Sequence, residues 1–145
     1  MKMIKAASAA IAAAALLAPA SPASAGPYWN KTVKCKETDP DGLVIPTRRG
    51  NGDLGWNHFS GKHNIRKCAV VNAALRGNVD KKNGPRREYW GYAIANGGRQ
   101  VKIVVVVQYA RRSADGEYDA GRGQKIGVVT AYCKGVRKCP DWVNV

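Results

Sequence analysis

The spacing of hydrophobic positions changes part-way along the chain. Between residues 65 and 76, hydrophobic residues recur at three- and four-residue intervals, which predicts a helix with Asn64 as its N-cap and Gly77 just beyond its end. Further along, alternating or continuous hydrophobic positions predict strands over 88–95, 99–109 and 125–133. The middle strand contains a run of valines from residue 104 to residue 107, which is typical of a strand buried on both faces.

The other segments are shorter or less regular. Residues 55–64 predict a short helix or helical turn, and residues 111–123 predict a polar loop. Residues 26–52 show little periodicity and predict an irregular N-terminal segment, so that the domain itself is expected to span residues 53–145. Helices followed by strands predict an α+β fold, with the N-terminal helices packed on one face of a small antiparallel β-sheet.

The N-terminus has the pattern of an export signal. Lys2 and Lys5 precede an uncharged apolar stretch, and small residues precede a cleavage site after Ala25. The apolar stretch is too short to span a bilayer, so residues 1–25 are predicted to be a secretory signal peptide. The mature protein is therefore expected to be secreted and to have no membrane span.

The chain contains four cysteines. An even number of cysteines in an exported protein predicts disulfide bonds. Four cysteines allow three pairings, and the favoured one joins Cys133 to Cys139 in a short loop and Cys35 to Cys68 in a longer loop. A zinc site is the alternative, but the C-x-x-C spacing typical of such sites is missing. We therefore expect a disulfide-stabilised domain with no metal.

The chain is strongly basic. It has 24 Lys and Arg residues against 10 Asp and Glu residues, and removal of Lys2 and Lys5 with the signal peptide leaves a net charge of +12. Such a charge favours binding to nucleic acid or to an anionic cell surface, although secreted proteins are also basic for solubility. The expected RNA-binding residues are Arg66, Arg87 and Lys125.

The only two histidines of the chain are His58 and His63. Histidine is suited to proton transfer near neutral pH, so the pair indicates one acid and one base. The alternative interpretation is two incidental surface histidines beside packed Trp56 and Phe59.

Three residues of the predicted strands could bind a phosphate. Lys102 precedes the valine run, where its side chain either reaches solvent or points into a cleft and neutralises a phosphate. Thr130 and Tyr132 are two positions apart, so their hydroxyls share one side of a strand and could bind a phosphate together. Threonine and tyrosine are also ordinary strand residues, which is the structural alternative.

Residues 55–63, the helix after them and residues 128–133 resemble secreted bacterial ribonuclease toxin domains. The nearest family is the EndoU-like nucleases of the barnase–EndoU–colicin–RelE superfamily. In that family, a histidine pair near the N-terminal helices is followed by a lysine and then by Thr-x-Tyr on a late strand. The catalytic residues that the resemblance implies here are His58, His63, Lys102, Thr130 and Tyr132. Three other lysines compete with Lys102 for its role, namely Lys62, Lys67 and Lys125.

The resemblance implies an endoribonuclease that uses no metal or other cofactor. One histidine removes the proton of a ribose 2′-hydroxyl, the oxygen attacks the adjacent phosphorus, and the other histidine protonates the departing 5′ oxygen. The product carries a 2′,3′-cyclic phosphate. The expected partners are RNA and a cognate inhibitor (immunity) protein, and the enzyme is expected to be a monomer that acts as a toxin. A non-enzymatic cationic protein and a small secreted inhibitor are the alternative functions.

Overall fold

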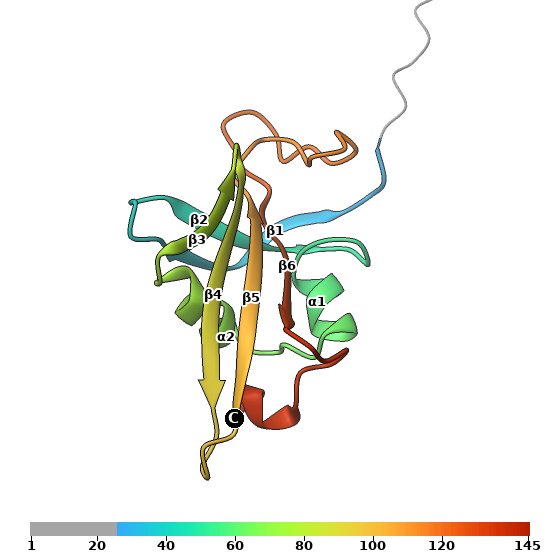
Figure 1. Cartoon of the computed structure of the whole chain (residues 1–145). Helices are drawn as coiled ribbons and strands as arrows, with labels where there is room; N and C mark the ends of the chain where they lie inside the picture. Colours follow the sequence, from blue (N-terminus) through green and yellow to red (C-terminus); the bar gives the residue numbers. More distant parts are fainter. Residues whose placement is uncertain (1–25) are drawn as a thin grey trace, which may run out of the picture.

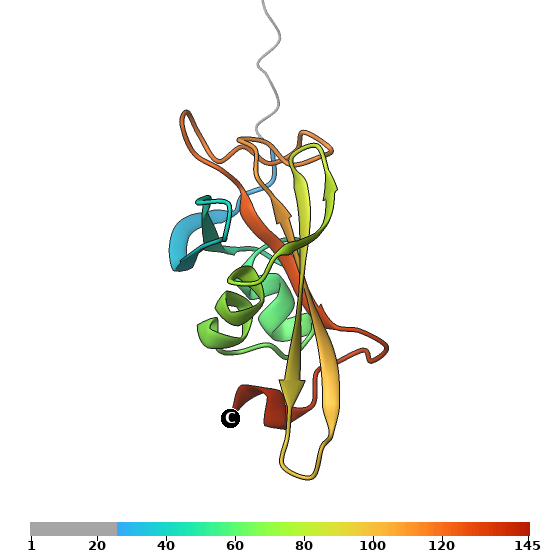
Figure 2. The same cartoon turned by 60° about the vertical axis from the view of Figure 1, so that its left-hand side comes forward.

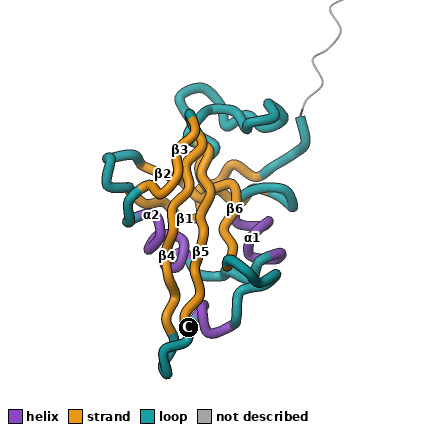
Figure 3. Tube along the Cα trace, in the orientation of Figure 1, coloured by secondary structure: helices purple, strands orange, loops and turns teal. Residues whose placement is uncertain are grey.

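The computed structural model describes residues 26–145, so the predicted signal peptide lies outside the described residues. In chain order the elements are β1 (Asn30–Thr38), β2 (Val44–Gly50), α1 (Trp56–Lys62), α2 (Cys68–Leu75), β3 (Val79–Asn83), β4 (Arg86–Ile94), β5 (Gln100–Gln108), β6 (Gly127–Cys133) and a 3₁₀ turn, η1 (Asp141–Asn144) (Figure 1). Strands β1 and β2 form an antiparallel hairpin, and β3, β4, β5 and β6 form a second antiparallel sheet in that order (Figure 3). The α+β fold predicted from the sequence is confirmed.

The two faces of the four-stranded sheet have different surroundings. Both helices, the β1–β2 hairpin and η1 lie on the same side of this sheet (Figure 2). On that side, Val105 of β5 packs in one hydrophobic core with Phe59 of α1 and Leu75 of α2. The alternate residues of β5, such as Val104 and Lys102, point to the opposite side because successive side chains of a strand alternate. We call this second side the outer face.

Strand β5 is buried on both faces, as its valine run predicts. Val104 and Val106 lie on the outer face, yet each is only 2% exposed. Val104 is flanked across the sheet by Trp90 and Tyr132, and Val106 by residues of the same two strands. These neighbours flank the valines, so the outer face of β4, β5 and β6 presents aromatic and polar side chains around them.

The prediction of an irregular segment over residues 26–52 is wrong. Residues 30–50 form the β1–β2 hairpin, and Ile45 is fully buried in the same core as Phe59. The hairpin therefore belongs to the folded domain, which does not begin at residue 53. Strand β1 is mostly exposed, with Cys35 as its one buried residue, so it lacks the alternation that would reveal a strand. Strand β3 was missed for the same reason.

The second helix begins later than the sequence predicts. Helix α2 starts at Cys68 and has no side-chain cap, so Asn64 is not its N-cap. Asn64 instead adopts a φ of 57°, and its side chain donates hydrogen bonds to the carbonyl of Cys139 at 2.8 Å and to Asp141 at 2.9 Å. Asparagine tolerates this left-handed conformation better than most residues, and these distant contacts stabilise it. The predicted end of this helix before Gly77 is confirmed, since α2 ends at Leu75 and Arg76 is its C-cap.

The favoured cysteine pairing is confirmed. Cys35 of β1 is bonded to Cys68 of α2, and Cys133 of β6 is bonded to Cys139, which leaves no free cysteine among residues 26–145. Such bonds are typical of proteins that fold in an oxidising compartment. In the same residues, no helix combines the length and the apolar character needed to cross a membrane.

The two disulfides are expected to contribute unequally to stability. They join residues that are 33 and 6 positions apart. Loop-closure entropy predicts that the free energy of unfolding falls by about 4 kcal/mol when Cys35 and Cys68 are both replaced by Ser. The same change at Cys133 and Cys139 should lower it by about 2 kcal/mol. Urea unfolding of the two double variants measures this difference, and peptide mapping of the native protein checks the pairing. Two or more free thiols in exported protein would contradict it.

Candidate active site

The two histidines lie next to each other in space. Their spacing of five residues corresponds to about 140° beyond one helical turn, which would separate them on a continuous helix. His63 is the C-cap of α1, with φ −115° and ψ 1°, so its backbone leaves the helix. The rings of His58 and His63 therefore meet, with their centroids 5.5 Å apart and their planes at 81°.

Helix α1 is held tightly against the rest of the domain. Phe59 is fully buried in the core, and the backbone N–H of Gly55 donates to the carbonyl of Val129 in β6 at 2.9 Å. Gly55 has a φ of 79°, and a Cβ there would lie 2.7 Å from the carbonyl oxygen of Arg48. Only glycine fits this close approach, so it fixes the start of the helix that carries His58.

Backbone carbonyls orient both imidazole rings. Nδ1 of His58 is 2.7 Å from the carbonyl oxygen of Gly52, and Nδ1 of His63 is 3.4 Å from that of Arg137. A carbonyl oxygen only accepts hydrogen bonds, so the network assigns a proton to each Nδ1. The two Nε2 atoms therefore remain available to accept or donate a proton.

The surroundings of His63 favour its neutral form. Burial is the main cause that lowers the pKa of His63 below the ordinary value of 6.5, and the positive charges of His58 and Lys62 lower it further. The hydrogen bond to the carbonyl of Arg137 opposes this shift but does not reverse it. A neutral imidazole with its proton on Nδ1 is a base at Nε2, so His63 suits the role of base and His58 that of acid.

The Thr-x-Tyr residues of β6 point to the outer face, and one of them, Tyr132, lies beside His63. The Tyr132 ring centroid is 5.9 Å from that of His63. Thr130 is two residues away on the same side of the strand. Its hydroxyl oxygen is buried and has no hydrogen-bond partner among the described residues. A buried hydroxyl without a partner costs about 1–3 kcal/mol, and because neighbouring atoms cover this oxygen, a ligand would reach it only after they shift.

Lys102 shares the outer face, but its ammonium group does not lie at the histidines. Val104 pairs with Tyr132, which makes Lys102 the diagonal neighbour of Tyr132, with Cα atoms about 7–8 Å apart. Its Nζ nevertheless lies 3.2 Å from the ring centroid of Trp90, on β4, away from β6. Lys62, at the end of α1, is the lysine whose charge acts on His63.

The three predicted RNA-binding residues have different environments. Arg66 is exposed and forms an ion pair with Asp141 at 3.4 Å. Lys125 is half-buried, with its Nζ 5.2 Å from the Tyr109 ring centroid. Arg87 is only 8% exposed and bonds to carboxylates of the β1–β2 turn, so its guanidinium is engaged inside the protein and not at the surface. Those carboxylates lie far away in the sequence, so local patterns do not reveal the pairing.

Sequence reasoning missed a contact that fixes the acceptor of His58. Gly52 lies in a turn in which Asn51 Oδ1 accepts the N–H of Asp53 at 2.8 Å. The Tyr118 hydroxyl donates to Asp53 Oδ2 at 2.8 Å and accepts from Asn51 Nδ2 at 3.2 Å. Tyr118 therefore clamps the turn whose carbonyl orients His58. The sequence feature that could have pointed to this contact is Tyr118 itself, which is the one aromatic residue of the predicted polar loop 111–123.

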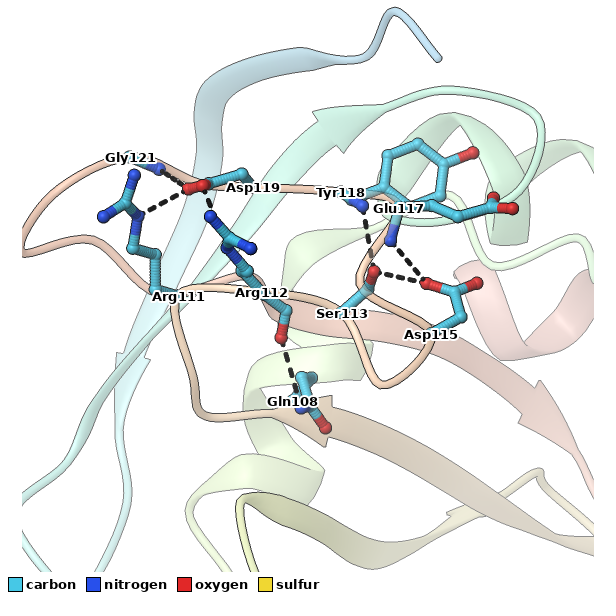
Figure 4. Close-up of polar contacts among 9 residues, drawn as sticks. All are labelled: Gln108, Arg111, Arg112, Ser113, Asp115, Glu117, Tyr118, Asp119 and Gly121. Carbon is cyan, nitrogen blue, oxygen red and sulfur yellow. Dashed lines mark hydrogen bonds and ion pairs between the residues drawn. The ribbon is translucent and has the colours of Figure 1, made fainter. Parts of the chain in front are cut away.

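The loop that carries Tyr118 is braced by its own polar side chains (Figure 4). Arg111 and Arg112 both pair with Asp119, at 2.7 and 3.3 Å. The hydrogen bond from Arg111 is the main reason that the pKa of Asp119 falls to about 2. Ser113 donates to Asp115 at 2.6 Å and accepts the backbone N–H of Tyr118 at 3.0 Å. These contacts give Tyr118 a defined position.

No protein-family model matches this sequence, and no curated protein matches it either. Within residues 26–145, no three His, Cys, Asp or Glu side chains are grouped closely enough to hold a metal ion together. What the site does is therefore inferred from its own geometry.

Proposed function

We propose that this protein is a secreted endoribonuclease that cleaves RNA through attack of the ribose 2′-hydroxyl, leaving a 2′,3′-cyclic phosphate. The observation that carries the proposal is the histidine pair. The ring centroids of His58 and His63 are 5.5 Å apart, and both Nδ1 atoms bond to backbone carbonyls. The two Nε2 atoms are thus left to serve one phosphodiester, one as base and one as acid.

The proposed reaction assigns a role to each neighbouring group. Nε2 of His63 takes the proton of the 2′-hydroxyl, the 2′ oxygen bonds to phosphorus, and the bond to the 5′ oxygen breaks. Nε2–H of His58 gives its proton to that departing oxygen. The hydroxyls of Thr130 and Tyr132 hold the non-bridging phosphate oxygens, and Lys62 neutralises the developing charge.

The setting of the enzyme follows from its charge and its cysteines. A mature net charge of +12 favours RNA as the partner. The predicted signal peptide and the two disulfides support export. A secreted ribonuclease of this kind would act as a toxin against competing cells, as a monomer, and the producing cell would need an inhibitor (immunity) protein.

The direct test is to incubate purified mature protein with total RNA in EDTA and to analyse the fragment ends. We expect cleavage with 2′,3′-cyclic phosphate ends, and no cleavage of DNA of the same length because DNA lacks the 2′-hydroxyl. Intact RNA, or equal cleavage of DNA, would overturn the proposal.

A non-enzymatic cationic binding protein is the second candidate. The outer face favours it in one respect, since Lys102 and Lys81 both lie over the Trp90 ring, 3.2 and 5.7 Å from its centroid. Cations and an aromatic ring together bind single-stranded nucleic acid without chemistry. RNA binding without turnover in the EDTA assay would favour this candidate.

RNA binding is expected to depend steeply on salt. If about five phosphates are neutralised, the affinity for single-stranded RNA should fall about 100-fold between 50 and 200 mM salt. Fluorescence anisotropy with the His58→Ala protein measures this without cleavage of the probe. Arg66→Ala and Lys125→Ala should each reduce the slope of log K against log salt by about 0.7. A flat dependence would show that the basic surface does not determine binding.

A further inference from the structure

A small pocket opens beside the proposed catalytic residues. It has a volume of about 300 Å³ and lies where β4, β5 and β6 meet the loop that carries Tyr118. Its polar lining residues include Asp53, Arg86, Gln108, Asp115, Glu117 and Tyr118. Ligand pockets usually enclose about 300–1,000 Å³, so this one suits a group the size of a single nucleobase.

The pocket adjoins the histidine site through two segments. Asp53, in its wall, directly follows Gly52, whose carbonyl binds His58. Val129, also in its wall, directly precedes Thr130 on β6. A nucleotide with its phosphate at the histidines would therefore place its base close to this pocket.

One wall of the pocket presents hydrogen-bond acceptors. Side chains of Asp115 and Glu117 extend from the same end of the loop as the Tyr118 ring, whereas Arg111, Arg112 and Asp119 occupy the other end (Figure 4). Asp115 Oδ1 is engaged by Ser113 and by the backbone N–H of Glu117. The Glu117 carboxylate takes part in none of the ion pairs of residues 26–145. Carboxylates repel phosphate, so the pocket is suited to a group that donates N–H bonds.

Donor and amide groups complete the lining. Arg86, opposite Gln108 across β4 and β5, also forms no ion pair within the described chain. Gln108 is only 7% exposed, and its Nε2 donates to the carbonyl of Arg112 at 3.2 Å. That bond fixes the amide, and Oε1 is left as a second acceptor. The pocket thus combines carboxylate acceptors with one unpaired guanidinium.

We propose that this pocket binds a guanine base of the RNA substrate next to the cleaved bond. The inference rests on the proposed ribonuclease function and specifies its substrate. Guanine carries adjacent donors, N1–H and the 2-amino group, that a carboxylate such as Glu117 accepts together. Its O6 and N7 are acceptors, for which a guanidinium such as Arg86 is the preferred partner. Uracil would turn carbonyl oxygens toward the carboxylates, and cytosine and adenine lack the paired donors.

The first test measures binding and needs no cleavage. The 3′-monophosphates of guanosine, adenosine, cytidine and uridine are titrated into the protein while its backbone amide NMR signals are recorded. We expect the guanosine compound to bind about tenfold or more tightly than the others and to shift the amides of Gln108, Glu117 and Tyr118. Glu117→Gln should remove this preference, because an amide cannot accept both donors. Glu37→Gln, on β1 and outside the pocket lining, is the control, because it removes a glutamate charge that is paired with Arg76 instead.

The second test separates this inference from the proposed function. Sequencing of RNA fragments should show cuts next to guanosine, and the Glu117→Gln enzyme should still cut but with its guanosine preference reduced about tenfold or more. Cleavage that is equal at all four bases, or that favours cytidine, would overturn the guanine pocket while leaving the ribonuclease intact. Tight guanosine monophosphate binding with no RNA cleavage would overturn the ribonuclease and support the pocket.

Discussion

Replacing His58 or His63 by Ala is expected to lower the rate of RNA cleavage about 10²–10⁴-fold in each case. In the proposed mechanism, each substitution removes the Nε2 atom that takes or gives the proton at its side of the phosphate. The fold reduction in rate for the double variant should be far smaller than the product of the two single fold reductions, because the two residues act as a unit. Initial rates on a defined RNA substrate measure all three variants.

The pH dependence of the rate tests the assignment of the two roles. A base must be neutral and an acid protonated, so kcat/KM should follow a bell-shaped curve that belongs to the pair. The lowered pKa of His63 keeps it neutral at more acidic pH. The acidic limb of the curve should therefore lie below the ordinary histidine value of 6.5.

These variants have a clear control. Both histidines are half-buried and neither belongs to the hydrophobic core, so the fold should persist in each variant. Asn57→Ala changes an exposed neighbour on the same helix and should leave the rate unchanged. If folded His58→Ala and His63→Ala proteins cleave RNA at the normal rate, the site assignment is wrong.

Asp39→Ala is expected to destabilise the protein by about 3–5 kcal/mol, because it leaves the buried Arg87 without its buried counter-charge. The Asp39 side chain is fully buried and lies 3.6 Å from the Arg87 guanidinium. It also accepts a hydrogen bond from the Tyr89 hydroxyl at 2.6 Å and backbone N–H bonds from Asp41 and Leu43. Burial is the main cause that raises the pKa of Tyr89, so its hydroxyl stays a donor to Asp39.

Asp41→Ala is the matched control for this prediction. Asp41 pairs with the same arginine at 2.9 Å, but its side chain is 60% exposed. Exposed partners contribute about 0–1 kcal/mol, so this variant should be nearly as stable as the native protein. Urea unfolding of both variants gives the comparison. If both variants lost the same free energy of unfolding, burial would not determine how much each aspartate contributes through its pair with Arg87.

Local patterns in the sequence determined the central part of this protein. The valine run of β5, the alternation of β4 and the glycine after α2 act over a few residues, so their structures follow from spacing alone. The presence of disulfides was also predicted, because an even number of cysteines behind a predicted signal peptide indicates them, but the sequence only favoured one of three possible pairings and the structure decided it. The candidate histidines were identifiable because the chain contains only two.

Tertiary contacts decided the rest. The exposed strands β1 and β3 carry too few buried residues for an alternating pattern, and sheet pairing and the core alone make them strands. Arg87 bonds to a carboxylate 46 residues away, and Tyr118 clamps Asp53 across 65 residues. The two histidines meet because His63 leaves the helix where the chain turns toward the Cys133–Cys139 loop. Such contacts join segments that are distant in the chain, so spacing along the sequence carries no trace of them.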